Sequence, residues 1–248
     1  MNRTKTNKRP LRGLLTVTLA LATCLTLGQT LRADVVIGTA DTGNCYPFMC
    51  NDSGSNVGQS IEYQQVYAAS QFSGPASINE ITFFQNFALQ FAPGTSVLNG
   101  DYNIYLSTTS AAVNGLSSNA AANEGADNTL FFSGNLAQDL SLSSGLLNIN
   151  GSTFNYDPGN GNLLMDVQVF NQDNVPNGSN GYLDADSSGT STSRAWCLGD
   201  SCGSSLIADS VGLVTEFHTS AVPEPSSIVM LGIGLLGLGL KARKALAR

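Results

Sequence analysis

The fold class of this chain is decided by one run of nine residues, Asn162-Leu163-Leu164-Met165-Asp166-Val167-Gln168-Val169-Phe170. From residue 164 to residue 169, Leu, Asp and Gln at the even positions alternate with Met, Val and Val at the odd positions. Successive side chains of a β-strand point to opposite faces, so a period of two predicts a strand with one buried face. The run from Tyr102 to Leu106 has apolar or aromatic residues at its even positions and predicts another.

Similar short runs, rich in β-branched and aromatic residues, recur along the chain between clusters of Gly, Asn, Ser and Asp. Only residues 111–126 have weak helical character, which Gly115 and Gly125 interrupt, so a helical turn or an irregular loop is expected there. This pattern predicts an all-β fold, an antiparallel two-sheet β-sandwich of the jelly-roll type. The expected strands are residues 34–38, 61–67, 76–86, 95–107, 129–133, 136–142, 146–149, 162–170, 181–183, 193–197 and 206–217.

The N-terminal 33 residues predict a secretory signal peptide for the Sec export machinery. Five Lys and Arg residues precede an apolar run at residues 14–27, which is the order of charge and hydrophobicity that such leaders share. We expect cleavage after Ala33, although Leu31, at the third position before the cleavage site, is larger than the small residue usually preferred there. A lipoprotein leader with Cys24 as the modified residue is the alternative, and Thr23 fits it poorly.

The C-terminal residues 222–248 have three parts in a fixed order. A rigid segment with Pro223, Glu224 and Pro225 comes first, an apolar run at residues 228–240 follows, and a basic tail at residues 241–248 ends the chain. As a helix, the apolar run would be about 20 Å long, which is shorter than the hydrocarbon core of about 30 Å. The basic tail should stay in the cytoplasm, so residues 34–221 should lie on the outer side of the inner membrane.

The order Val-Pro-Glu-Pro-Ser-Ser, short Gly-rich hydrophobic helix and basic end resembles the PEP-CTERM sorting domain of exopolysaccharide-producing Gram-negative bacteria. The same segment is also classified as an ice-binding protein C-terminal domain, a label that says nothing about ice here. The resemblance implies recognition and processing by an exosortase, with a transient stop in the inner membrane before delivery to the cell surface. Short runs such as residues 43–48, 63–67, 161–167 and 208–217 are also similar to exported domains of other PEP-CTERM proteins, for which the resemblance implies no catalytic residues.

Charge is distributed very unevenly and excludes some partners. Ten of the 11 Lys and Arg residues lie before residue 34 or after residue 240, and Arg194 alone lies between. Because 17 of the 18 Asp and Glu residues lie in residues 34–222, this span has a formal charge of −16. Nucleic acids and anionic membrane surfaces are bound by cationic patches, so the exported domain should bind neither.

Four cysteines remain after the leader, in two pairs with four residues between the members of each pair. Exported proteins meet oxidising conditions, so we expect the local disulfides Cys45–Cys50 and Cys197–Cys202. Four cysteines allow three pairings, and the sequence does not choose among them. A zinc site with four thiolates is the alternative, which the compartment and the distance between the pairs in the sequence disfavour.

The chain has one histidine, His218, which excludes metal sites built from several histidines. Oxygen ligands remain, and the spacing of Asp184, Asp186 and Ser188 before a Gly is typical of the start of a calcium loop. The twelfth position, where an EF-hand needs Glu, is Ala195. The segment is therefore either a calcium loop of another kind or an ordinary turn, and no other cofactor is expected.

Three features that resemble enzyme motifs have simpler explanations. The Gly pattern at residues 232–237 has the spacing of a dinucleotide-binding loop, yet it lies in the terminal apolar run with no room for a βαβ unit. Residues 199–201 spell Gly-Asp-Ser, but Thr215 stands where that family of lipases would have Asp, and His218 should be exposed after the last strand. Two carboxylates for glycoside cleavage are defined in space, so the sequence leaves that option open.

We therefore expect an exported, exosortase-sorted protein whose non-catalytic domain at residues 34–221 acts at the cell surface or in an exopolysaccharide matrix. A carbohydrate-binding module, with or without Ca²⁺, is the alternative, and a glycan-active hydrolase is a third. The module would need an aromatic platform, although aromatic residues in strands more often belong to the core. The candidates for that platform are Tyr46, Phe48, Tyr63, Tyr67, Phe83, Phe84, Tyr102, Tyr105 and Trp196.

Overall fold

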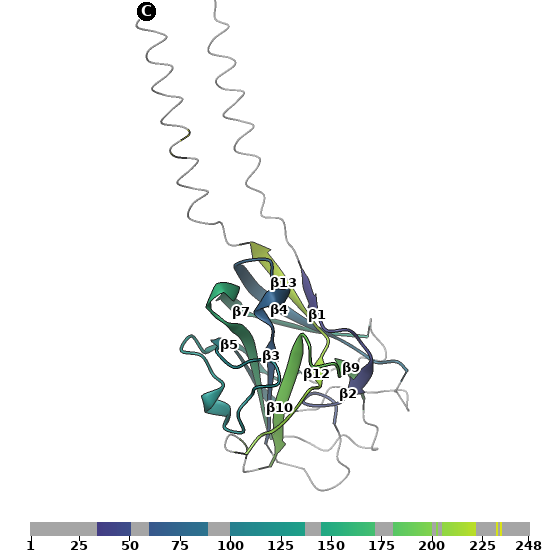
Figure 1. Ribbon diagram of the computed structural model, residues 1–248. Coiled ribbons are helices and arrows are strands. Elements are labelled where there is room, and N and C mark those ends of the chain that lie inside the picture. The colour runs from purple at the N-terminus through teal and green to yellow at the C-terminus, as the bar shows by residue number, and fades with distance from the viewer. Residues whose placement is uncertain are drawn as a thin grey trace, which may run out of the picture. The chain divides into compact units, whose positions relative to one another are not determined.

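The computed structural model describes residues 34–50, 60–88, 100–136, 145–171, 181–199, 202 and 205–221, together with Gly232 and Gly234. Figure 1 shows strands joined by loops in the described part of the chain. The described residues also include three short 3₁₀ turns. The strands are β1 Val35–Ile37, β2 Thr42–Asn44, β3 Ile61–Tyr67, β4 Ala76–Phe84, β5 Asp101–Thr109, β6 Thr129–Gly134, β7 Leu146–Tyr156, β8 Asn162–Phe170, β9 Leu183–Asp186, β10 Thr192–Leu198, β11 Ile207–Asp209, β12 Gly212–Leu213 and β13 Thr215–Ala221.

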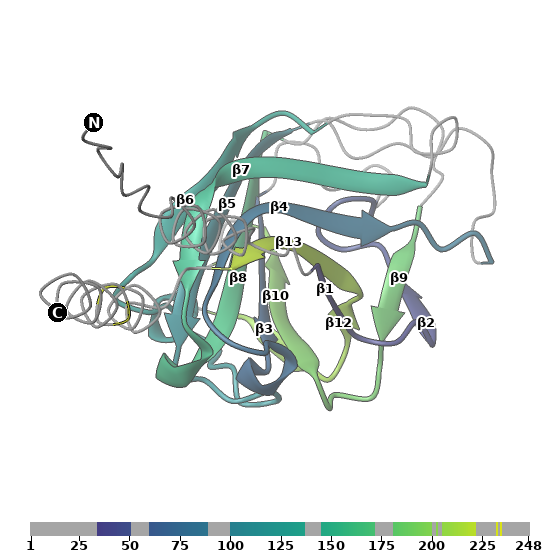
Figure 2. The same ribbon diagram turned by 90° about the horizontal axis from the view of Figure 1, so that it is seen from above.

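The strands form three antiparallel sheets, which confirms the all-β prediction. A four-stranded sheet has the order β1-β13-β4-β7, a six-stranded sheet has the order β11-β10-β3-β8-β5-β6, and a three-stranded sheet has the order β12-β9-β2. Figure 2 shows β7, β4, β13 and β1 side by side, with β9, β12 and β2 at the end of the domain where β1 lies. Two sheets were expected and three are present, and the jelly-roll order is not confirmed.

The run that predicted the fold is β8, and it lies in the middle of the six-stranded sheet between β3 and β5. Its odd-numbered residues belong to the main hydrophobic core, which also contains inward-facing residues of the four-stranded sheet such as Ile81 and Phe217. The core therefore fills the space between the two larger sheets. The 3₁₀ turns are Ala69–Gln71, Ala120–Ala122 and Pro158–Asn160.

The middle of the even-numbered face of β8, at Leu164 and Asp166, is also buried, which the alternation did not predict. The connection between β5 and β6, at residues 110–128, folds over this face and forms a second, smaller core with it. Leu116 and Ala120 of this loop pack with Leu164 of β8, and the Asn123 side chain donates a hydrogen bond to Gln64 Oε1 of β3 at 2.7 Å. Residues 111–126 are thus the irregular loop that was expected, with one 3₁₀ turn.

The polar residue Gln65 on β3 shows how the core accommodates an amide. Its Oε1 accepts hydrogen bonds from the Tyr63 hydroxyl at 2.6 Å and the Leu213 N–H at 2.8 Å, and its Nε2 donates to the Leu213 carbonyl at 2.8 Å. Buried polar groups are costly unless they are paired. Gln65 is thereby satisfied, and it joins the six-stranded sheet to the short strand β12.

The C-terminal part of the domain differs from the prediction in its strand boundaries. One strand was expected at residues 206–217, and the chain instead forms β11, β12 and β13 in three different sheets. The break after β11 is a turn in which Asp209 Oδ1 accepts the Val211 N–H at 2.9 Å. The strand β2 was not predicted, and the expected strands at residues 95–107 and 136–142 lie partly outside the described residues.

The last strand, β13, lies inside the four-stranded sheet and not at its edge. It pairs with β1, where Val35 is opposite Phe217, and on its other side with β4, where Phe217 is opposite Ile81. The prediction that His218 is exposed after the last strand is therefore wrong. His218 lies within β13, and its side chain is only 19% exposed.

Candidate functional site

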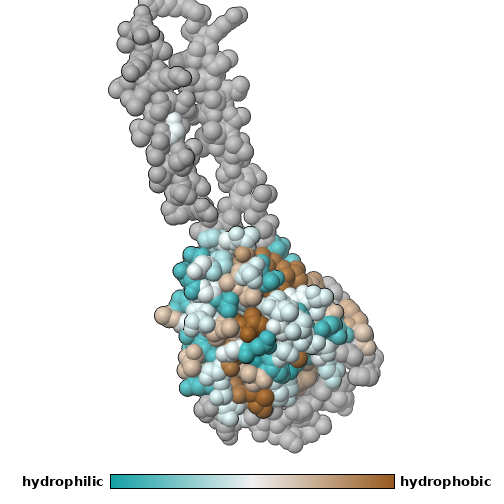
Figure 3. Space-filling model, viewed as in Figure 1, coloured by the Kyte–Doolittle hydropathy of each residue, from teal (hydrophilic) through white to brown (hydrophobic). Residues whose placement is uncertain are grey.

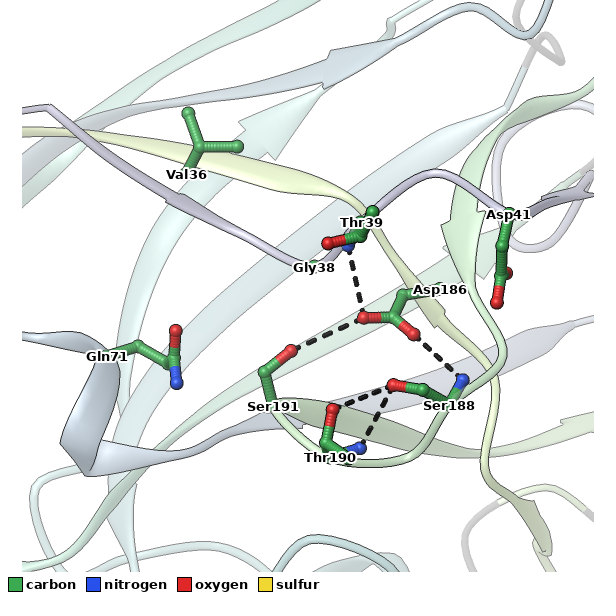
Figure 4. A pocket seen from close by; sticks show the side chains of 9 residues that line it. All are labelled: Val36, Gly38, Thr39, Asp41, Gln71, Asp186, Ser188, Thr190 and Ser191. Carbon is green, nitrogen blue, oxygen red and sulfur yellow. Dashed lines mark hydrogen bonds between the residues drawn. The ribbon is translucent and has the colours of Figure 1, made fainter.

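A polar pocket of about 470 Å³ opens between the loop that follows β1 and the loop that joins β9 to β10. Figure 4 shows the side chains that line it, and no aromatic ring is among them. The hydroxyl and carboxylate groups come from different parts of the chain. The lining residues are Val36, Gly38, Thr39, Asp41, Gln71, Asp186, Ser188, Thr190 and Ser191.

The carboxylate of Asp186 joins the two loops of this pocket. Its Oδ1 accepts the Ser188 N–H at 2.8 Å, and its Oδ2 accepts the Thr39 N–H at 3.1 Å and the Ser191 hydroxyl at 3.5 Å. Burial opposes ionisation, but these hydrogen bonds outweigh it and lower the pKa of the carboxyl group below its ordinary value. Asp186 is therefore ionised and holds the loops together.

The structure gathers only two of the three residues that were predicted to bind calcium. Asp186 and Ser188 both line the pocket, whereas Asp184 is not among its lining residues. Burial raises the pKa of Asp184, and a hydrogen bond from Asn86 offsets part of this effect. The Ser188 N–H that contacts Asp186 Oδ1 is the donor of an ordinary Asx turn, and calcium binding here remains a prediction.

Both predicted cysteine pairs are joined in the structure, Cys45 to Cys50 and Cys197 to Cys202. The second disulfide lies beside a smaller pocket of about 290 Å³ whose lining includes Glu62. Neither disulfide lies at the polar pocket between the β1 and β9–β10 loops. Their positions therefore indicate a structural role at the ends of β2 and β10.

Most of the aromatic residues considered for a sugar platform belong to the core. Five of them are fully buried, namely Phe48, Tyr63, Tyr67, Phe83 and Tyr102. The half-buried Trp196 is stacked on Tyr46, with ring centroids 4.5 Å apart. The guanidinium of Arg194 lies 5.6 Å from the Trp196 ring centre. One face of this ring is already covered, so these residues do not form an open platform.

Arg194, the single cation of residues 34–222, is held inside the domain. Its Nε and Nη2 atoms each donate to Asp209 at 2.9 Å, and Nη1 donates to Asn44 Oδ1. Burial opposes its charge, but the bonds to Asp209 and the nearby Tyr63 outweigh this effect and raise the pKa of Arg194. The only guanidinium of this span is thus used to connect β10, β11 and β2.

A group of acidic residues lies on the face of the six-stranded sheet that the 110–128 loop covers. Asp166 is 1% exposed, and its Oδ1 has no hydrogen-bond partner. Burial, followed by the charges of Glu62 and Glu124, raises the pKa of Asp166 to about 7, although hydrogen bonds from Gln168 and Gln64 oppose the shift. Burial and the charge of Glu124 also raise the pKa of Glu62. The strand alternation placed Asp166 on the face opposite the core but gave no sign that a loop carrying Glu124 would bury it.

His218 lies among carboxylates on the outward face of the four-stranded sheet. Its Nδ1 is 3.3 Å from Asp34 Oδ1, and its Nε2 is 3.9 Å from Glu80 Oε1 and 4.0 Å from Glu216 Oε2. The Thr82 hydroxyl is 3.0 Å from Nε2. Sequence reasoning missed this group because its members come from β4, β13 and the residue before β1, which are far apart in the sequence.

Gly199 and His218, two described residues of the feature that resembled a serine hydrolase, lie at different sheets. Gly199 follows β10 in the six-stranded sheet, where the Cys202 N–H donates to its carbonyl at 3.2 Å and closes a turn. His218 is on the four-stranded sheet and its ring contacts Thr82 and carboxylates. Residues 200 and 201 lie outside the described residues.

The sorting residues Pro223, Glu224 and Pro225 lie outside the described part of the chain, as does most of the expected helix at residues 228–240. Within that segment, Gly232 and Gly234 are described, and both have helical conformation. Among the residues that the structure describes, no helix is both long and apolar enough to span a bilayer.

Comparison with known proteins identifies the C-terminal segment. The PEP-CTERM protein-sorting motif matches residues 221–244, which begin at the last residue of β13. No curated protein and no solved structure matches the chain. The motif indicates exosortase-dependent export and sorting to the cell surface, as the resemblance implied. The chain is therefore an all-β protein with a PEP-CTERM sorting motif, for which an exosortase is the processing partner.

Proposed function

We propose that this protein is a non-catalytic component of the cell surface or of an extracellular polysaccharide matrix. The observation that carries the proposal is the sorting motif at residues 221–244, which follows the last strand of the all-β domain without a linker. A domain delivered in this way serves outside the cell. The two disulfides suit a protein that works in an oxidising environment.

The placement of the reactive side chains supports a role without catalysis. A nucleophile needs a positioned base, and the imidazole of His218 contacts carboxylates and Thr82. The charged groups of Asp186 and Arg194 form their hydrogen bonds with other residues of the domain. These groups hold loops and strands together.

The surface of the domain supports contact with a polymer that is neutral or is bridged by cations. The span 34–222 has a formal charge of −16 and its single guanidinium is internal, so acidic polymers would be repelled unless divalent cations lay between. Figure 3 shows apolar areas separated by polar ones on the face that it presents. Among the described residues, the exposed large apolar side chains come from separate parts of the chain, and they are Val36, Phe87, Leu130, Phe170 and Ile207.

Replacing Pro223-Glu224-Pro225 by three alanines is expected to trap the protein at the inner membrane with its C-terminal tail attached. The exosortase reads the motif, so the altered chain should stay unprocessed while folding of residues 34–221 is unaffected. Cell fractionation and intact mass of the recovered chain are the measurements. Replacing Asp157 by Asn, on an exposed turn outside the motif, is the control and should leave delivery unchanged.

Normal surface delivery of the triple alanine variant would contradict the role of the motif. The matrix role is tested separately. When the polysaccharide is isolated from cells, the delivered wild-type protein should be recovered with it. Recovery of all the delivered protein in the soluble medium would contradict that role and leave the sorting result intact.

The polar pocket favours a second candidate, the binding of a small polyhydroxylated ligand such as a saccharide unit. The hydroxyl groups that line it can donate hydrogen bonds to sugar hydroxyls and accept hydrogen bonds from them, and the carboxylates can accept. We expect glycan binding that weakens when Thr190 is replaced by Val, and that increases with Ca²⁺ if Asp186 and Ser188 contribute ligands. A glycan array with and without Ca²⁺ measures this, and no binding in either condition would exclude this candidate.

A further inference from the structure

We propose that Asp34, Glu216 and His218 form a binding site for a divalent transition-metal cation of the Zn²⁺ type. One potential ligand atom from each of the three side chains lies within 4.8 Å of the other two. Imidazole nitrogen and carboxylate oxygen together are ligands of Zn²⁺, whereas Ca²⁺ and Mg²⁺ select oxygen ligands. The mixed set therefore indicates a transition metal.

Two paired strands bring these ligands together. Glu216 and His218 are two residues apart on β13, so their side chains point to the same face of the sheet. The register of β1 on β13 sets Val35 opposite Phe217, which brings Asp34 to the level of His218. As a result, Asp34 Oδ1 lies 3.3 Å from His218 Nδ1. The backbone thus brings the three groups near one another, and the Glu216 carboxylate, whose Oε2 lies 4.0 Å from Nε2, would turn toward Nδ1 to contact the same ion.

A chain of hydrogen bonds assigns the tautomer of the imidazole. The Thr82 hydroxyl donates its hydrogen to Asn148 Oδ1 at 2.9 Å, so in its 3.0 Å contact with His218 the ring Nε2–H is the donor. A neutral imidazole has one N–H, which leaves the lone pair of Nδ1 facing the Asp34 carboxylate. These two groups repel unless a cation lies between them. Metal-binding histidines commonly donate their second ring N–H to such an outer partner.

The charge around the ring favours a divalent cation over a single proton. Three carboxylates surround the imidazole, since Glu80 Oε1 is also 3.9 Å from Nε2. Their negative charge exceeds the single positive charge of a protonated ring. The only guanidinium of residues 34–222 is on the other large sheet, where it is bonded to Asp209. A divalent ion would balance the charge of the group more completely.

Metal binding would connect the two ends of the exported domain. Asp34 is the first described residue and directly precedes β1, and His218 lies three residues before the sorting motif begins. In the described part of the chain, β1 pairs with β13 alone. An ion held by both strands would therefore strengthen the attachment of this edge strand.

The single histidine allows a direct test on the full chain. The protein is purified in detergent micelles with an affinity tag that lacks histidine, stripped with a chelator, and observed by imidazole ¹⁵N NMR, which reports one residue only. Added Zn²⁺ should shift the Nδ1 signal, saturate at one ion per chain and leave Nε2 protonated. Added Ca²⁺ should leave the signal unchanged. If Zn²⁺ has no more effect than Ca²⁺, the group holds a proton and the proposal is overturned.

Variants then assign the ligands. Asp34→Asn and Glu216→Gln should each weaken Zn²⁺ binding by about tenfold or more, since loss of even an outer partner of a metal site costs that much. Asp157→Asn is the matched control, because that carboxylate caps an exposed turn through the Gly159 N–H, and it should leave the affinity unchanged. Circular dichroism confirms that each variant is folded. Unchanged affinity in both ligand variants would overturn the assignment.

Discussion

Replacing Arg194 by Met is expected to lower the free energy of unfolding by about 3 kcal/mol, the lower end of the cost of breaking a buried ion pair. Methionine retains an apolar stem beside Trp196 but leaves the Asp209 carboxylate and Asn44 Oδ1 without the guanidinium hydrogen bonds. No other Lys or Arg of residues 34–222 can replace it. Equilibrium unfolding in urea at neutral pH measures the loss.

Two further variants separate the geometry of this group from its charge. Arg194→Lys keeps a positive charge but cannot reach Asp209 and Asn44 together, so we expect a loss of more than half that of the Met variant. Asp209→Asn should cost less than Arg194→Met, since the Asp209 side chain is 36% exposed and the guanidinium keeps its contacts with Asn44 and Trp196. Equal stability of the wild type and Arg194→Met would contradict the structural role of the guanidinium.

Replacing Asp166 by Asn is expected to stabilise the protein at pH 8. It should also make the free energy of unfolding vary less with pH between pH 4 and pH 7. The folded pKa of Asp166 is raised to about 7, above its value in the unfolded chain, so the folded state binds the extra proton in this range. Stability of the wild type should therefore fall as pH rises through it. The rise of the Asp166 pKa from 3.8 to about 7 is about three pKa units. It corresponds to a loss of at most about 4 kcal/mol in the free energy of unfolding at pH 8.

The physical cause of this cost is the burial of a carboxylate that has one oxygen without a hydrogen-bond partner. An amide at residue 166 carries no charge, so it is not repelled by the nearby carboxylates of Glu62 and Glu124. Unfolding curves of the variant and the wild type at several pH values give the difference. Asp157→Asn is the control on an exposed turn. A constant difference between Asp166→Asn and wild type from pH 4 to pH 8 would contradict the raised pKa.

The sequence predicts the strands of this protein better than it predicts their partners. β3 and β8 begin and end where the alternation and turn residues placed them, at residues 61–67 and 162–170. Alternation gives the two faces of a strand, but it does not say what covers each face. The loop at residues 110–128 buries the Asp166 side of the sheet through Leu116 and Ala120, and its composition gave no sign of this.

A candidate site was predicted from the sequence only where its residues are close together along the chain. The pattern at residues 184–188 predicted a possible calcium loop. The structure places Asp186 and Ser188 at a pocket that Thr39, from a distant segment, also lines. The group around His218 has members on β4, on β13 and directly before β1, so only the strand register brings them together. The sorting motif, by contrast, is read as a linear segment, and the sequence identified it directly.

The position of β13 also determines when this protein can fold. Export proceeds from the N-terminal end, and β13 is the last strand to leave the membrane, yet its neighbours β1 and β4 belong to the first half of the chain. These long-range pairings form slowly, and they are complete only after residue 221 has crossed. β4 and β7 can pair earlier, but the four-stranded sheet lacks its inner strand until β13 is outside. Residue 221 is both the last residue of β13 and the first residue of the sorting motif, so the exported sheet is completed only when the motif directly follows its last strand.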